Sequence, residues 1–310
     1  MNIQTKLLHM DGSESGTIDL PSIFSTPYRY DVIHKAYVNL LSHSYQRQGR
    51  YPMAGEVVSA ESRNTGLGIA RLARAKGEGF SRAGQAAGVA GIRQGRVAHP
   101  PESWKNIYKK VNEKEKQLAL CSAIAATARK DLIERRGHRV SNISSFPIIV
   151  TDDIENISKT KDLLKLLNAV GLKDELHRLD VSRKPRSGTA RRRGRRGRSA
   201  VSAIIIISSD KTTSAVQQDS ANGSETTIRS SRTKTSSKKN KDNKYKNLLK
   251  LSGSIRGIDV KQVKDLSVLD FAPGSKPIRL AIFSESAVKE LDSIKKPAVQ
   301  RIMEMMVQSK

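Results

Sequence analysis

The sequence predicts an α/β protein: an open, mostly parallel, Rossmann-like sheet with flanking helices, interrupted by a long extended internal loop. Three observations support this prediction. Short β-branched runs alternate with helical patterns in the second half of the chain, as in parallel sheets covered by helices. A basic, glycine-rich stretch at 49–101 shows no hydrophobic period. The 310 residues carry a net charge of +26, which indicates a polyanionic partner, with nucleic acid the first candidate.

The ordered elements follow from periodicity and capping residues. Apolar residues at helical spacing predict helices over 31–44, 112–136 and 159–170. Apolar and β-branched runs predict buried strands at 146–150 and 203–207. The second of these runs contains no charged residue, which is typical of a central strand buried on both faces.

The same alternation resumes after residue 242. The patterns predict a helix at 245–251, strands at 254–260, 268–271 and 279–283, and closing helices at 284–292 and 297–308. Together the elements form a single α/β domain over 1–310. Three segments interrupt it: the internal loop 49–101, a basic loop at 182–199, and a Ser/Thr/Lys-rich insertion at 208–242 that is predicted to be disordered.

The internal loop is predicted to bind RNA rather than to pack a core of its own. Residues 49–95 hold 10 of the 21 glycines, which allow close approach of the backbone, and arginine contacts phosphate bidentately. Tyr51 and Phe80 are available for stacking on bases, whereas Trp104 is predicted to be a packing anchor where the loop rejoins the domain. The candidate RNA-binding residues in and beside the loop are Arg47, Arg50, Arg63, Arg71, Arg74, Lys76, Arg82, Arg93, Arg96 and His99.

The basic loop is the second candidate RNA-binding segment. It contains nine basic residues and no acidic one between Ser182 and Ser199, spaced by glycines, and such a segment suits contact with an RNA backbone. The alternatives are a solvated loop or an import signal. Its candidate residues are Arg183, Lys184, Arg186, Arg191, Arg192, Arg193, Arg195, Arg196 and Arg198.

One acidic cluster supports a competing hypothesis. Asp152, Asp153 and Glu155 follow the strand predicted at 146–150, where α/β sheets often hold Mg²⁺, so a Mg²⁺-dependent RNA-processing enzyme is the alternative function. The favoured interpretation is a solubilising turn near the positive end of the next helix. No nucleotide-binding glycine motif and no His/Cys ligand spacing occurs, so no cofactor, metal or small-molecule substrate is predicted.

Cysteine content and hydropathy indicate a cytoplasmic protein without a membrane segment. The single cysteine, Cys121, excludes an internal disulfide framework. The longest apolar-rich run, at 118–128, is too short to span a bilayer.

Several residue strings stand out in the sequence: Phe24–Arg29, Gly95–Pro101, Asn112–Thr127, the Arg191–Arg198 loop, and Leu269–Gly274 followed by Ser284–Ala287. In their order and spacing these strings resemble the family of ribosomal protein four of the large subunit, in its archaeal and eukaryotic branch. The resemblance covers nearly the whole chain.

The resemblance implies a structural, non-catalytic constituent of the large ribosomal subunit. A globular domain would lie on the outer face of that subunit, and the internal loop would penetrate the ribosomal RNA towards the peptide exit tunnel. The implied partners are large-subunit ribosomal RNA and neighbouring ribosomal proteins, including the other tunnel-lining protein, in support of subunit assembly and translation. A general DNA binder of the chromatin type remains a third possibility.

Overall fold

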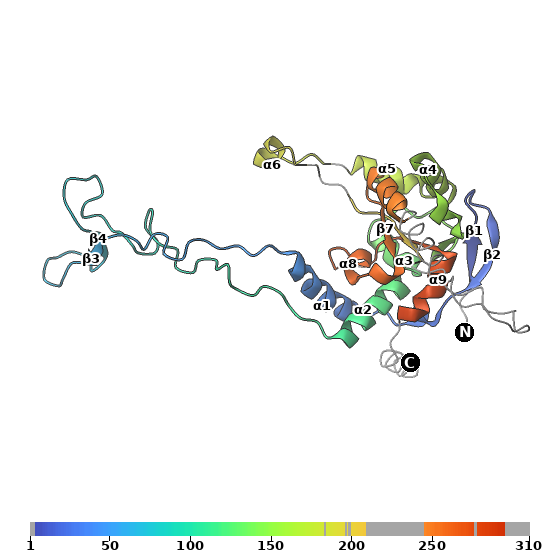
Figure 1. Ribbon diagram of the computed structural model, residues 1–310, viewed down its shortest axis with the longest axis horizontal. Coiled ribbons are helices and arrows are strands. Elements are labelled where there is room, and N and C mark those ends of the chain that lie inside the picture. Colours follow the sequence, from blue (N-terminus) through green and yellow to red (C-terminus); the bar gives the residue numbers. More distant parts are fainter. Residues whose placement is uncertain are drawn as a thin grey trace, which may run out of the picture. The chain divides into compact units, whose positions relative to one another are not determined.

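The computed structural model describes residues 4–182, 184–195, 197, 200–208, 245–275 and 278–294. The chain forms two compact units (Figure 1). We call the unit made of Met1–Leu40 and Lys110–Lys310 the body, and the unit made of Leu41–Lys109 the arm. Each unit is described here by itself.

The body is built on a six-stranded sheet with strand order β2-β1-β5-β8-β6-β7. Every neighbouring pair is parallel except β1 and β2, which form an antiparallel pair at one edge. The central strands β5, β8 and β6 are buried at every residue, as expected for strands covered on both faces. The strands are β1 (Gln4–Leu8), β2 (Glu14–Asp19), β5 (Ile148–Val150), β6 (Ile204–Ile207), β7 (Asp259–Gln262) and β8 (Ala281–Ser284). The α/β class and the mostly parallel sheet are therefore confirmed.

Helices cover both faces of this sheet. Side chains along a strand alternate between the two faces, so the apolar residues of a central strand need helices on both sides to bury them. Ile204 and Ile206 belong to one apolar cluster, with residues of α1, α2, α8 and α9, whereas Ile205 and Ile207 belong to a second, with residues of α3 and α4. The helices are α1 (Tyr30–Leu41), α2 (Glu113–Ala126), α3 (Lys130–Arg135), α4 (Thr160–Ala169), α5 (Lys173–Val181), α6 (Gly188–Arg192), α8 (Val268–Phe271), α9 (Glu285–Leu291) and the helical residues 245–254. No helix in the described part of the chain is long and apolar enough to cross a bilayer.

Three predicted elements differ from the structure. The helix expected over 112–136 is two helices, α2 and α3, because Arg129 between them has an extended backbone. The strand expected at 268–271 is the short helix α8, which begins with a reciprocal capping box between Ser267 and Asp270. The strand expected at 254–260 starts only at Asp259, since helical structure continues to residue 254.

The sequence analysis did not predict the β1–β2 pair or helix α5. The helix expected at 297–308 and residues 209–242 of the expected insertion lie outside the described residues. The other helices and strands of the body occur where the patterns place them, within a few residues at each end, except for a short helix in the basic loop.

A buried charged cluster links α5 to the start of β6. Glu175 is 1% exposed, and its carboxylate accepts hydrogen bonds from several residues around it. Arg178 donates to it through Nε at 2.8 Å and Nη2 at 2.6 Å, and the Ser202 hydroxyl donates at 2.6 Å. The Arg139 backbone N–H donates at 2.9 Å, and Nδ1 of buried His138 lies 2.7 Å from a carboxylate oxygen. A single carboxylate thus ties three separate segments of the body together.

Candidate nucleic-acid interface

The two ends of the arm lie side by side and close it into a double leg (Figure 1). At its base the Lys109 backbone N–H donates to the Ser42 hydroxyl at 3.0 Å, and His43 Nε2 lies 2.9 Å from the Lys109 carbonyl oxygen. Further along, the Arg50 backbone N–H donates to the Pro101 carbonyl at 3.3 Å. The arm is therefore a closed loop whose legs are hydrogen-bonded to each other.

Glycine is required where the legs approach most closely. A Cβ on Gly49 would lie 2.5 Å from the Ser103 backbone nitrogen, closer than real Cβ contacts allow. A Cβ on Gly55 would lie 2.6 Å from the Gly95 carbonyl oxygen, and Gly55 also has a φ of +83°. The glycine content of the internal loop thus has a local reason besides access to RNA.

The far end of the arm has a framework of its own. Strands β3 (Ala60–Ser62) and β4 (Ala73–Ala75) form an antiparallel pair, and Arg74 is bridged to Ala86 on the other side of β4. The Ala75 backbone N–H donates to the Gln85 carbonyl at 2.9 Å. In the whole arm only the Ser42 residue is buried. Backbone hydrogen bonds rather than an apolar core hold this unit together, in agreement with the sequence pattern.

One group of predicted RNA-binding residues braces the arm itself. Arg74 Nη1 donates to the Gly84 carbonyl at 3.0 Å. Arg82 Nη2 donates to the Arg93 carbonyl at 3.0 Å, and Arg50 donates to the Ala54 carbonyl. Arg96 lies 3.8 Å from the Glu56 carboxylate, and all four of these arginines are half-buried. Their first role is to hold the irregular backbone.

A second group faces solvent. Arg63, Arg71 and Arg93 are exposed, and their side chains make no hydrogen bond or ion pair with the described chain. Arg47 lies over the Tyr108 ring, 5.0 Å from its centroid, and Lys76 pairs with Glu61 at 2.5 Å. His99 is exposed as well. The three unpaired arginines are the ones best able to exchange solvent and counterions for phosphate.

Apolar side chains on the arm also face solvent. Trp104 is 63% exposed, so the prediction that it packs as an anchor is wrong. Tyr51 is 66% exposed and Phe80 47% exposed, and both keep ring surface available for stacking. Exposed apolar residues are spread along the arm because it has no core in which to bury them. The sequence signal for this exposure is the missing hydrophobic period.

The basic loop is described at 184–195 and 197, whereas Arg183, Arg196 and Arg198 lie outside the described residues. Part of it forms the short helix α6, which the sequence analysis did not anticipate. Arg186 is half-buried, and the other basic residues of the described part are exposed: Lys184, Arg191, Arg192, Arg193 and Arg195. The loop thus presents a second cluster of solvated cations.

The acidic cluster behind the enzyme hypothesis supports the fold. Asp152 accepts a hydrogen bond from the Ser286 backbone N–H at 2.9 Å and another from the Ser286 hydroxyl, at the start of α9. Glu155 accepts from the Ser284 hydroxyl and from the Ser208 backbone N–H, each at 3.2 Å. Among the residues that the structure describes, no group of three or more His, Cys, Asp or Glu side chains could hold a metal ion.

Replacing Asp152 by alanine is expected to lower the free energy of unfolding by about 1–2 kcal/mol, because the substitution removes a capping hydrogen bond at α9. Affinity for RNA should stay unchanged. Denaturant unfolding and filter binding measure the two effects. The control is Asp153→Ala at the neighbouring, exposed position, which should change stability by less than about 0.5 kcal/mol. A loss of RNA-cleaving activity on Asp152→Ala would instead favour the enzyme hypothesis.

An α/β body, an arm without an apolar core that carries exposed arginines, and a second basic loop together define the class of nucleic-acid-binding proteins. The sequence model of the "Ribosomal protein L4/L1 family" matches residues 18–294. The chain belongs to this ribosomal protein family.

Similar proteins extend over almost the same length. "Large ribosomal subunit protein uL4" of Saccharolobus islandicus (strain M.14.25 / Kamchatka #1) is 34% identical over 286 residues, which are 92% of this chain and 92% of that protein. The proteins of the same name from Saccharolobus solfataricus and Haloquadratum walsbyi are 33% and 32% identical, each over 289 residues. Those matches cover 93% of this chain, and 94% and 99% of the two relatives.

Proposed function

We propose that the arm and the basic loop are the segments through which this chain binds large-subunit ribosomal RNA, and that the far end of the arm reaches the wall of the peptide exit tunnel. As a member of its family, the chain is a structural constituent of the large ribosomal subunit, binds ribosomal RNA and is not an enzyme. The proposal assigns that function to particular residues.

The observation that carries the proposal is the set of unpaired cations on a unit without a core. Arg63, Arg71 and Arg93 are exposed on the arm and have no partner in the described chain. Because arginine binds phosphate through paired N–H groups, these side chains can neutralise RNA phosphates without breaking any contact within the arm. Exposed Lys184, Arg191, Arg192, Arg193 and Arg195 extend the same argument to the basic loop.

The tunnel assignment and the protein partners follow from the family resemblance. The arm's exposed glycines and small side chains suit passage through narrow spaces between RNA helices. We propose contacts with neighbouring large-subunit proteins, including a second tunnel-lining protein, at the arm's exposed apolar residues. His99 and the bracing arginines Arg50, Arg74, Arg82 and Arg96 would contact RNA through the donors that remain free.

The triple variant Arg63→Gln, Arg71→Gln and Arg93→Gln is expected to weaken binding to large-subunit RNA and to flatten its salt dependence. Each lost phosphate contact lowers the slope of log K against log salt concentration by about 0.7–0.9, so the total decrease is about 2–3. Filter binding over a salt series measures this slope. Unfolding of the variant should match that of the unmodified protein, because none of the three side chains makes a hydrogen bond or ion pair with the described chain.

A matched control removes the same charge from the body. Lys161, Lys165 and Lys173 are exposed on or beside α4 and α5. The triple Lys→Gln variant at these positions should change the slope by less than about 1, because such surface charges act only through screened, long-range attraction. Equal decreases in both triple variants would show that net charge alone, rather than contact by the arm, accounts for binding.

A further inference from the structure

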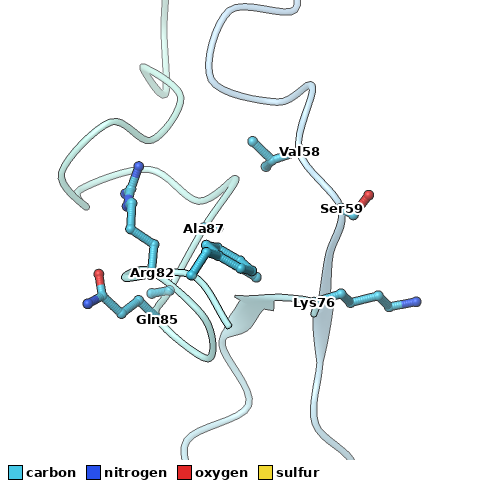
Figure 2. A pocket seen from close by; sticks show the side chains of 9 residues that line it. Val58, Ser59, Lys76, Arg82, Gln85 and Ala87 are labelled. Atoms are coloured by element: carbon cyan, nitrogen blue, oxygen red, sulfur yellow. The ribbon is translucent and has the colours of Figure 1, made fainter. Parts of the chain in front are cut away.

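A small cavity lies within the far end of the arm. Its volume is about 230 Å³, and its wall is mostly apolar, with Val58, Ala75, Phe80, Ala86 and Ala87. Figure 2 shows Val58 on one side of the cavity and Arg82, Gln85 and Ala87 on the other, while Lys76 extends away from it. The cavity is thus a compact apolar recess with one guanidinium group beside it.

Backbone hydrogen bonds fix the segments that form this cavity. The Lys76 N–H donates to the Ser59 carbonyl at 2.9 Å, which joins the two sides of the β3–β4 pair. The Ala87 N–H donates to the Ala73 carbonyl at 3.0 Å, and the Gly84 N–H to the Ala75 carbonyl at 3.2 Å. The recess is therefore formed before any partner binds, and a partner loses little binding energy to ordering the protein.

The size and the lining of the cavity fit a small, flat ligand group with apolar faces. Pockets that hold drug-sized molecules usually measure about 300–1,000 Å³, and this cavity is smaller. Phe80 keeps about half of its surface exposed, and its ring carbon Cε1 lies 3.3 Å from the place that a Cβ on Gly77 would occupy. One atom of the ring is thus close to Gly77, and an aromatic group can stack on the exposed part of the ring.

The cationic group beside the cavity is held in a fixed orientation. Arg82 donates through Nη2 to the Arg93 carbonyl at 3.0 Å and through Nη1 to the Gln94 side chain. A guanidinium has five N–H donors, so three remain free after these two bonds. An anion close to an apolar, planar group is therefore the chemistry that complements this site.

We infer that the cavity binds one unpaired nucleobase of large-subunit ribosomal RNA, with the base against Phe80 and its phosphate at Arg82. This inference rests on the proposed RNA-binding function of the arm. A nucleotide combines both, because its flat aromatic base and its anionic phosphate are joined through one sugar. An apolar side chain of a neighbouring protein would leave Arg82 without a counter-charge, and the arm carries 11 basic against 4 acidic residues, which favours RNA.

Chemical probing of the bases in large subunits assembled with the full-length chain tests this inference. Phe80→Ala is expected to raise the reactivity of one or a few nucleotides by about fivefold or more, because a base loses its stacking partner. Ala87→Leu fills the cavity but keeps the ring, and it should expose the same nucleotides. Phe80→Tyr should leave them protected.

The matched control is Tyr51→Ala, which removes an exposed aromatic ring of the arm that does not line the cavity. It should leave those nucleotides protected. An unchanged probing pattern in subunits that contain Phe80→Ala or Ala87→Leu would overturn the inference, as would the same change with Tyr51→Ala. If no nucleotide responds and a neighbouring ribosomal protein becomes sensitive to proteolysis instead, the cavity binds protein and the inference is wrong.

This outcome is separable from a failure of the proposed function. Phe80→Ala and Ala87→Leu leave every cation of the arm in place, so the salt dependence of RNA binding should match that of the unmodified protein. A normal salt dependence with no responding nucleotide rejects only the base-binding cavity. A triple Arg→Gln variant with an unaltered salt slope rejects the proposed function of the arm itself.

Discussion

Excising residues 56–95 and joining Gly55 to Arg96 is expected to leave the body folded while it removes most of the arm's RNA affinity. The junction is short, because the Cβ position of Gly55 lies only 2.8 Å from the Arg96 backbone nitrogen. The excised segment contains six basic residues, of which Arg63, Arg71 and Arg93 are unpaired. The salt slope of RNA binding should therefore fall by at least about 2, and by up to about 5.

Sedimentation provides the second measurement for this excision. The shortened chain should appear in large-subunit fractions at a reduced level, and bases that face the arm should become reactive to chemical probes. Unfolding of the body by denaturant should match that of the full chain, which controls for general damage. Normal incorporation together with an unchanged probing pattern would contradict the proposed role of the arm.

Replacing Glu175 by alanine is expected to lower the free energy of unfolding by about 3–5 kcal/mol, the usual cost of removing one partner from a buried ion pair. The substitution leaves Arg178, His138 and the Ser202 hydroxyl without their shared acceptor. Since domains are stable by only about 5–15 kcal/mol, this is a large fraction of the total. Denaturant unfolding of the purified protein measures the change.

The pH dependence of stability gives an independent test of the same carboxylate. Burial alone would raise the pKa of Glu175, but the hydrogen bonds from Arg178, His138, Ser202 and the Arg139 backbone outweigh it and hold the pKa well below its usual range. A lowered folded-state pKa contributes stability that is fully present above the unfolded pKa of about 4.3 and is lost as the pH falls below it. Glu175→Ala should therefore flatten the acid side of the stability profile.

The matched control for Glu175 is Glu134, an exposed acid on α3 whose carboxylate lies 3.7 Å from Lys130 one turn away. Glu134→Ala should cost no more than about 0.5 kcal/mol, as expected for a surface ion pair. If both variants lose the same stability, the hydrogen bonds accepted by Glu175 stabilise the body no more than a surface ion pair does.

The sequence predicted the central strands of the body well, because their burial on both faces leaves a direct compositional signal. The run at 204–207 consists of four isoleucines, and no helical or amphipathic pattern competes with it. The edge strand β2 gave no such signal. Every residue of β2 except Ile18 is exposed, so this strand lacks the apolar alternation by which strands are found.

The short helix α8 shows a different limit. Val268 and Phe271 are apolar and buried, which fits a strand as well as a helical turn. Ser267 and Asp270 decide between the two, because their reciprocal side-chain hydrogen bonds begin a helix. The capping residues are present in the sequence, but the strand prediction rested on the apolar run alone.

The composition of the sequence predicts which segments form the candidate interface, but it does not predict the role of each basic residue within them. The basic residues of the arm are visible in the sequence, yet Arg63 and Arg82 look alike there. They differ because the Arg93 carbonyl and the Gln94 side chain, 11 and 12 residues further along, come within reach of Arg82 only in the folded arm. The cavity beside Phe80 also depends on such non-local pairing, so no local pattern reports it.

The closure of the arm at its base, between Ser42 and Lys109, means that the arm has no free end. A single-ended tail can leave a surrounding RNA by sliding out along its own length, one residue at a time. A closed double leg is wider and must withdraw as a whole. If RNA folds around the arm as we propose, we expect the closed arm to be retained until the surrounding RNA opens.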